Sequence, residues 1–216
     1  MCMDFLDIKN QLTVLNTRAD MYHFDIMDGH FVKNITLSPD IAKAMAPACD
    51  IPQDFHLLVN HPGDFIDMTA DAVQSLTDRG IICLISPQAE VISGEAFRMI
   101  DHIKARGLKA GVVLNPETPM CMIESYMHKL DIITFMSIDP GFAGQKFIPE
   151  SLERARTVRE KLDSLGRRDV PIEMDGGIGP ANAAEVIRAG VQMLVAGSAV
   201  FKSENPQETI KALRNA

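Results

Sequence analysis

The strongest constraint on the fold is a regular alternation of short apolar runs with longer segments of helical hydrophobic spacing. The runs have the length and the flanking turn residues of β-strands, and they cover 21–27, 54–59, 81–85, 109–114, 131–136, 171–174 and 191–196. Helices are predicted at 5–18, 38–48, 62–79, 94–106, 120–128, 149–165, 180–189 and 206–214. Strands and helices that alternate at this spacing favour parallel strands joined by helical crossovers.

The chain begins with a helix, although each strand–helix unit should begin with a strand. We therefore predict an α/β fold, a (β/α)8 TIM barrel with a truncated or missing first strand, formed by residues 1–216 as a single domain. An open doubly wound sheet is the alternative. The barrel is preferred because every candidate polar site lies at the end of a strand or just after it. A missing strand would leave neighbouring backbone groups unpaired, which should lower stability and invite pairing with another chain.

Composition narrows the possible partners and location. The chain has 29 acidic and 21 basic residues, a net charge of -8 and no Lys/Arg block, so we expect no nucleic acid partner. Its four cysteines form no C-x-x-C pair, which favours a reducing, cytoplasmic environment. No leader and no run of about 18 apolar residues occurs, so neither secretion nor membrane insertion is expected.

Four polar residues at strand ends are candidates for a metal site. Alternation along strand 21–27 places His23, Asp25 and Met27 on one face. His56 lies in the next strand, Asp175 follows the strand at 171–174, and a barrel would bring them to the same mouth. Two imidazoles and two carboxylates could bind a divalent ion, zinc first, with manganese, iron or cobalt also compatible. Taken alone, each of these residues is more often a histidine of the core or an aspartate that caps a turn or helix. All four at strand ends of one barrel favour a metal site instead.

Glycine-containing loops follow the last three predicted strands. Backbone N–H groups in such loops, next to a helix N-terminus, attract phosphate oxygens, so we expect a phosphorylated ligand. Alternatively, the glycines only permit tight turns. The candidate phosphate- or substrate-binding residues are Gly141, Ala143, Gly144, Gln145, Gly176, Gly177, Gly197 and Ser198.

Three long motifs resemble the ribulose-phosphate 3-epimerase family. They are His-Phe-Asp-Ile-Met-Asp-Gly-His-Phe-Val-x-Asn at 23–34, Pro-Gly-Phe-Ala-Gly-Gln-Lys-Phe at 140–147 and Met-Asp-Gly-Gly-Ile at 174–178; Ala-Gly-Ser-Ala-Val-Phe at 196–201 supports them. The similarity covers essentially the whole chain. Residues 1–4, 34–39 and Ala143 look closer to the D-allulose-6-phosphate 3-epimerase branch than to the pentose branch.

The resemblance implies a function for each candidate residue. His23, Asp25, His56 and Asp175 would bind the metal, and the two aspartates would move protons on opposite faces of substrate C3. The resulting enediolate would be stabilised by the metal as a Lewis acid. Met27 and Met136 match methionines that form an apolar wall around the reacting atoms. The substrate would be a phosphorylated ketose, with D-allulose 6-phosphate preferred and D-ribulose 5-phosphate as the alternative, in a homo-oligomer.

Three departures from the family pattern stand beside this resemblance. The family's first-strand serine would fall before Met1, and its fourth-strand His-x-Glu motif is replaced by Ile85-Ser86-Pro87-Gln88-Ala89-Glu90. Leu58 stands where methionine is common. A degenerate, non-catalytic sugar-phosphate-binding protein is therefore the alternative from another class, although the intact set of four ligands argues against it.

Overall fold

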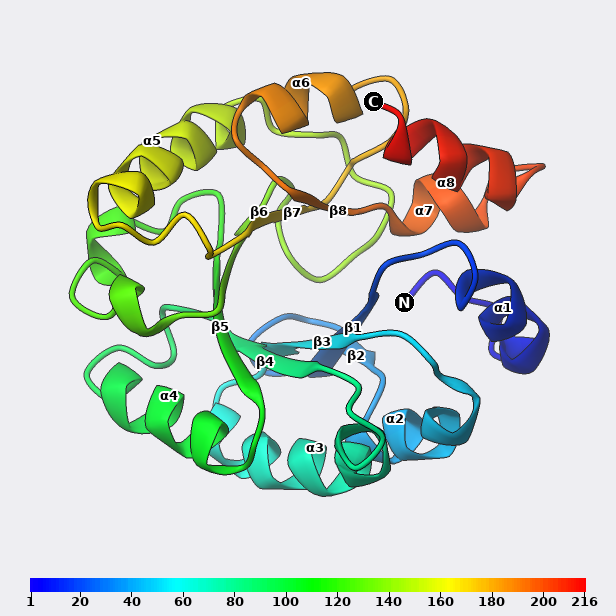
Figure 1. Ribbon diagram of the computed structural model, residues 1–216, viewed down its shortest axis with the longest axis horizontal. Helices are drawn as coiled ribbons and strands as arrows, with labels where there is room; N and C mark the ends of the chain where they lie inside the picture. Colours follow the sequence, from blue (N-terminus) through cyan, green and yellow to red (C-terminus); the bar gives the residue numbers. More distant parts are fainter.

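The computed structural model describes all 216 residues and contains a parallel sheet that curls into an open barrel (Figure 1). The parallel strands are β1 (Tyr22–Asp28), β3 (Gln53–Leu58), β4 (Cys83–Pro87), β5 (Lys109–Leu114), β6 (Ile132–Met136), β7 (Ile172–Asp175) and β8 (Met193–Val195). A short additional strand, β2 (Ile35–Thr36), pairs antiparallel with the last residues of β1. The predicted barrel with a missing first strand is confirmed.

Helices cover the outer face of the sheet (Figure 1). They are α1 (Ile8–Leu15), α2 (Pro39–Met45), α3 (Pro62–Thr77), α4 (Ala96–Ala105), α5 (Ser151–Ser164), α6 (Ala183–Arg188), α7 (Gly197–Phe201) and α8 (Pro206–Arg214). None of them combines the length and the hydrophobicity that crossing a lipid bilayer requires. Because helices and barrel interior cover both faces of the central strands, every residue of β3, β4 and β6 is buried.

The predicted helix at 120–128 is wrong. The segment forms two short 3-10 turns, η2 (Met120–Met122) and η3 (Met127–Lys129). Ile123 and Tyr126 are buried between the two turns, and the segment is linked by backbone hydrogen bonds between residues three apart, such as Tyr126 N–H to the Ile123 carbonyl at 3.1 Å. Two elements were not predicted. β2 is only two residues long, and Gly197 and Ser198 begin helix α7 instead of forming a loop.

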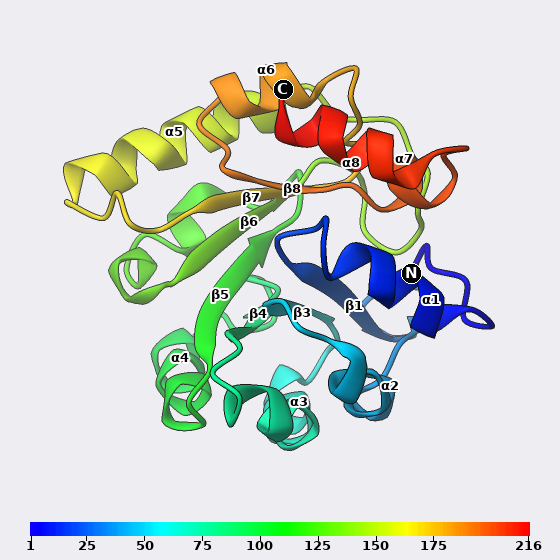
Figure 2. The ribbon, with the colours of Figure 1, turned by 45° about the vertical axis from the view of Figure 1, so that its right-hand side comes forward.

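The barrel is open between β8 and β1, which are not paired with each other (Figure 2). A cleft of about 500 Å³ lies there, and most of its lining side chains are apolar, among them Phe24, Leu194, Val200 and Ile210. All three residues of β8 are only half-buried, in contrast to the strands on the closed side of the sheet. An absent strand accounts for this, because it would have covered the free edges of both neighbours.

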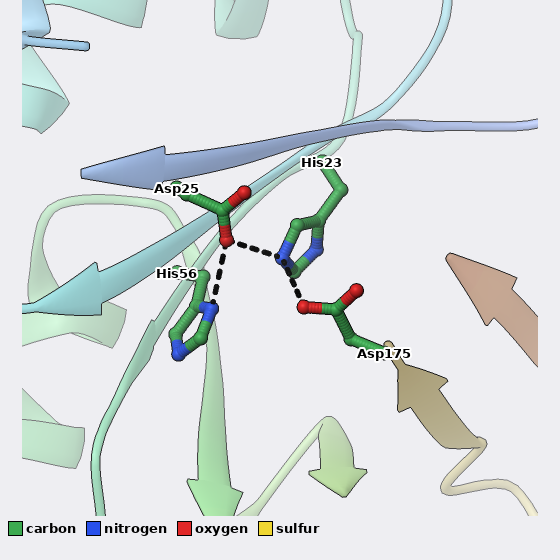
Figure 3. Close-up of side chains that lie close together, drawn as sticks. All are labelled: His23, Asp25, His56 and Asp175. Carbon is green, nitrogen blue, oxygen red and sulfur yellow. Dashed lines mark hydrogen bonds and ion pairs between the residues drawn. The ribbon is translucent and has the colours of Figure 1, made fainter. Parts of the chain in front are cut away.

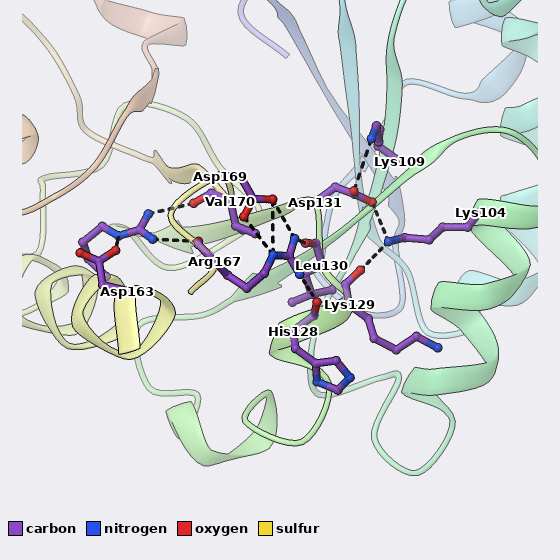
Figure 4. Close-up of polar contacts among 11 residues, drawn as sticks. Lys104, Lys109, His128, Lys129, Leu130, Asp131, Asp163, Arg167, Asp169 and Val170 are labelled. Carbon is purple, nitrogen blue, oxygen red and sulfur yellow. Dashed lines mark hydrogen bonds and ion pairs between the residues drawn. The ribbon is translucent and has the colours of Figure 1, made fainter. Parts of the chain in front are cut away.

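The edge of the barrel opposite the strands' carboxyl ends is held by charged side chains (Figure 4). Arg167, which precedes β7, donates to the Leu130 carbonyl at 3.0 Å and pairs with Asp169 at 3.0 Å. Asp131, which precedes β6, accepts from Lys104 at 3.1 Å and lies 3.5 Å from Lys109. Exposed pairs of this kind contribute about 0.2–1 kcal/mol each, so they tie adjacent loops without dominating stability.

Candidate active site

The four predicted ligands lie together at the carboxyl end of the barrel (Figure 3). β1 carries His23 and Asp25, β3 carries His56, and β7 ends at Asp175. Asp25 Oδ1 lies 3.2 Å from His56 Nδ1 and 3.5 Å from His23 Nε2. His23 Nε2 also lies 3.8 Å from Asp175 Oδ2, and the four ligand atoms are all within 4.8 Å of one another.

This spacing fits one divalent cation. Bonds of about 2.0–2.2 Å place the ligand atoms of a tetrahedral centre about 3.3–3.6 Å apart. The three contacts within the cluster, at 3.2, 3.5 and 3.8 Å, bracket that range. Two imidazole nitrogens and two carboxylate oxygens suit zinc, and they are equally acceptable to manganese, iron and cobalt. The cluster can therefore hold a metal ion without specifying which one.

Two buried carboxylates beneath the cluster orient His23, and sequence reasoning did not identify them. Asp54 Oδ2 lies 3.0 Å and Glu173 Oε1 lies 3.5 Å from His23 Nδ1. Each acid has its own support, because Ser86 Oγ donates to Asp54 at 2.7 Å and Thr134 Oγ1 donates to Glu173 at 3.0 Å. His23 is thus held with Nδ1 toward the barrel floor and Nε2 toward the other ligands. Such support fixes the orientation of a metal-binding imidazole.

A sequence signal for these residues existed. Alternate residues of a strand face the same side, which is the argument that placed His23 with Asp25. Three further pairs of polar residues are also two positions apart, so each pair shares a face. The pairs are Asp54 with His56, Glu173 with Asp175, and Ser86 with Gln88. Ser86 and Gln88 lie in the segment that departs from the family's fourth-strand motif, and both contact the site's polar network.

Burial and neighbouring charges shift the pKa values of three ligands. Burial raises the pKa of Asp175 to about 6, and the Asp25 charge adds to the increase. Burial also acts on Asp25, but the close contacts of its carboxylate with His23 and His56 outweigh burial and hold its pKa well below the usual range. For His23, burial favours the neutral ring, yet contacts with Asp25 and the buried acids hold its pKa well above the ordinary value. The two aspartates therefore differ in proton affinity although they share one site.

The cluster opens into a small cavity of about 100 Å³. Met27 and Met136, predicted as an apolar wall, line this cavity and are almost fully buried. Leu58, which stands where the family commonly has methionine, lines the same wall. Met1 and Cys2 border the cavity as well, so the first residues of the chain reach the site.

Most of the predicted phosphate-binding residues surround the same cavity. Its lining includes Gly141, Ala143, Gly144, Gly176, Gly177, Gly197 and Ser198. Gln145 is different, because its side-chain amide donates to the carbonyls of Asp139 at 2.6 Å and Phe142 at 2.9 Å and so braces the loop itself. Lys202, just after α7, forms no ion pair, and its Nζ lies 3.8 Å from the position that a Cβ on Gly144 would occupy. The cavity is thus bordered by the backbone of these loops, and an unpaired ammonium group lies beside one of its lining residues, Gly144.

Gly177 is required by close packing as well as by its backbone angle. Its φ is +64°, and a Cβ there would lie 2.8 Å from the backbone nitrogen of Phe147, which cannot move away as a flexible side chain would. We expect Gly177→Ala to reduce the free energy of unfolding by about 2–4 kcal/mol in urea denaturation. Gly80→Ala is the matched control, because φ is +77° and no atom lies within 4 Å; it should cost only about 1 kcal/mol. Equal losses in the two variants would contradict the packing argument.

Fold and cluster together define an α/β-barrel protein with a His2Asp2 site at the carboxyl ends of its strands. The chain belongs to the ribulose-phosphate 3-epimerase family, whose model matches residues 1–201. It is 40% identical over 214 residues to the ribulose-phosphate 3-epimerase of Bacillus subtilis, covering 99% of this chain and 94% of the relative. The Escherichia coli K12 enzyme of that name is 39% identical over 200 residues, covering 91% and 84%. Relatives with this name are epimerases acting on carbohydrates, so this chain is an isomerase.

Solved structures with little sequence similarity support the fold alone. A chain of the Pyrococcus furiosus tryptophan synthase complex superposes with a TM-score of 0.68 at 13% identity, covering 99% of this chain and 93% of that one. A phosphoribosyl anthranilate isomerase from Thermus thermophilus gives a TM-score of 0.59 at 17% identity, covering 95% and 91%. Both comparisons place this chain among proteins of the same barrel-like architecture.

Proposed function

We propose that this protein is a metal-dependent 3-epimerase of a phosphorylated ketose. The observation that carries the proposal is the convergence of His23, Asp25, His56 and Asp175 beside a cavity bordered by glycine-rich loops. D-Ribulose 5-phosphate is the first candidate substrate, because relatives 39–40% identical to the chain are named ribulose-phosphate or ribulose-5-phosphate 3-epimerases. D-Allulose 6-phosphate, which the details at 34–39 and Ala143 favoured, stays a prediction that a direct comparison of the two sugars would test.

The chain's own residues can supply proton transfer at substrate C3. The C3 proton is acidic because the neighbouring C2 carbonyl spreads the charge left behind into an enediolate. Asp25, whose pKa is held low, is ionised at neutral pH and can act as the base on one face. Asp175, whose pKa is raised to about 6, can return a proton to the other face. A divalent ion in the cluster would supply Lewis-acid stabilisation of the negative charge.

The surroundings of the two aspartates suit this chemistry. Met27, Leu58 and Met136 form an apolar wall, and excluding water from that side would strengthen the electrostatic interactions at the carboxylates. The loops of Gly144 and Gly176–Gly177 and the start of α7, which line the same cavity, offer backbone N–H groups for the substrate phosphate. A ketose held by its phosphate would then present C3 to the carboxylates.

The decisive experiment is solvent exchange. Purified protein loaded with zinc, manganese, iron or cobalt is incubated in D2O with each of the two ketose phosphates, and deuterium at C3 is followed by NMR. Exchange with one sugar, together with the appearance of its C3 epimer, is expected. Binding of a sugar phosphate without exchange under any metal would instead support a non-catalytic binding protein.

Lys202 provides a test of where the phosphate sits. Its ammonium group is unpaired beside Gly144, so it should attract a phosphate dianion without contacting the reacting carbon. We expect Lys202→Met to raise KM about 3- to 10-fold and to leave kcat within about twofold, because an exposed charge pair is worth about 1 kcal/mol. The exposed Lys161 of α5 forms no ion pair and is the control; Lys161→Met should change neither constant. An unchanged KM for Lys202→Met would contradict this placement.

A further inference from the structure

Gln88 is a buried polar residue that contacts the ring of His56 from outside the ligand cluster. It follows β4 directly, is fully buried, and places its side-chain Nε2 2.8 Å from Nε2 of His56. Its Oε1 is also buried and has no hydrogen-bond partner. On the other side of the same ring, His56 Nδ1 lies 3.2 Å from Asp25 Oδ1. The fully buried imidazole is therefore held between an amide and a carboxylate.

In a neutral His56 ring, these contacts match one of the two tautomers. A neutral imidazole carries its proton on one nitrogen and accepts a hydrogen bond at the other. Because an amide NH2 can only donate, Nε2 is the acceptor as the side chains stand, and the proton lies on Nδ1, directed at Asp25. Every nitrogen of the ring then has a partner that matches it.

Binding of a metal through Nδ1 requires the other tautomer. Nδ1 faces the cluster, so it is the ligand atom, and it must give up its proton to bind a cation. The ring proton then lies on Nε2, which needs an acceptor, since burying an unpaired N–H costs about 1–3 kcal/mol. A half-turn of the Gln88 amide exchanges its NH2 for Oε1 in almost the same place, and Oε1 is the atom that is otherwise unpaired.

We infer that Gln88 is a positioning residue that pairs with both tautomers of His56 and thereby presents Nδ1 to the metal. An amide suits this role because it holds a donor and an acceptor on one rotatable group, whereas a carboxylate can only accept. The inference rests on the proposed metal site. It also gives a physical role to the residue at 88, within the segment that departs from the family's fourth-strand motif.

Two measurements on the whole protein test the inference, and neither depends on turnover. Zinc affinity is measured by competition with a chromogenic chelator, and the tautomer of His56 is measured from its side-chain 15N shifts by NMR. Gln88→Met keeps the length of the side chain but cannot form the hydrogen bond, so we expect zinc affinity to fall about 10- to 100-fold. In the metal-free variant, the Nε2 resonance of His56 should shift because its donor is gone.

The variant Gln88→Glu tests whether residue 88 acts through its hydrogen bond to His56 or only by packing against the ring. Its carboxylate can accept from Nε2–H but cannot donate to a bare Nε2. This variant should therefore hold the His56 proton on Nε2 with or without zinc, and should bind zinc more tightly than Gln88→Met. In the parent protein, the proton should move from Nδ1 to Nε2 when zinc is added.

The matched control is Gln53→Met. Gln53 is also fully buried and has unpaired amide atoms. It lies three residues before His56 in β3, so the alternation of side chains places it on the opposite face of the strand. It should alter neither zinc affinity nor the His56 shifts. Parent-like zinc affinity and an unshifted His56 resonance in Gln88→Met would overturn the inference. If the parent binds no zinc, the proposed metal site is wrong. The hydrogen bond between Gln88 and His56 is then tested only by comparing the metal-free 15N shifts of the parent and Gln88→Met.

Discussion

Replacing Asp175 with asparagine should reduce exchange of the substrate C3 proton by about 100- to 10,000-fold, the usual contribution of a positioned acid or base. Asparagine keeps the shape of the side chain, but it can neither take up nor release a proton. Asp175 lies 3.8 Å from His23 Nε2 within the cluster, so the change also removes one charged metal ligand. The measurement is deuterium incorporation at C3 with saturating metal and substrate.

Asp175→Asn should keep its fold, and above pH 7 it should not lower the melting temperature of the metal-free protein. Burial raises the pKa of Asp175 to about 6 in the folded protein, above its value of 3.8 in an unfolded chain. The folded state therefore binds this proton more tightly, and stability is lost as the pH rises from about 4 through about 6. Above pH 7, metal-free Asp175→Asn should consequently melt no lower than the metal-free parent. A large fall in melting temperature, or exchange within tenfold of the parent, would contradict the assignment.

Removing the metal should abolish exchange, and the metal affinity should depend steeply on pH. Binding requires an ionised Asp175 and an unprotonated His23, whose pKa values are raised to about 6 and well above 6.5, respectively. Between pH 6 and the pKa of His23, metal binding must release the His23 proton. Metal affinity should therefore fall about tenfold for each unit by which the pH is lowered. Below pH 6 Asp175 is protonated as well, so affinity should fall by more than tenfold for each further unit of pH decrease.

Calorimetry can count those protons. Zinc is titrated into metal-free protein at pH 7 in buffers of different ionisation enthalpy, and the slope of apparent enthalpy gives the number released. At least one proton, from His23, is expected at pH 7, and the number should increase at pH 5.5, where Asp175 must also lose its proton. His23→Gln should bind zinc more weakly and release about one proton fewer. An affinity that does not change from pH 5.5 to 7.5 would show that these groups are not the ligands.

The sequence predicted most of the architecture because its signals are local. Each of the seven parallel strands was found, and the helices at 62–79 and 206–214 agree closely with α3 and α8. The error at 120–128 arose because apolar spacing over nine residues cannot separate a short helix from two 3-10 turns. β2 was missed because its two residues form a strand only through their pairing with β1.

The residue types of the site, and the faces on which they lie, were determined by the sequence alone. Strand periodicity is a local property, so it placed His23 beside Asp25 and could equally have placed Asp54 beside His56. The tertiary structure decided which nitrogen of each imidazole faces the cluster and how far the two aspartates differ in pKa. It also decided that an apolar cleft lies open between β8 and β1. These features depend on the register and closure of strands distant in sequence, which no local pattern encodes.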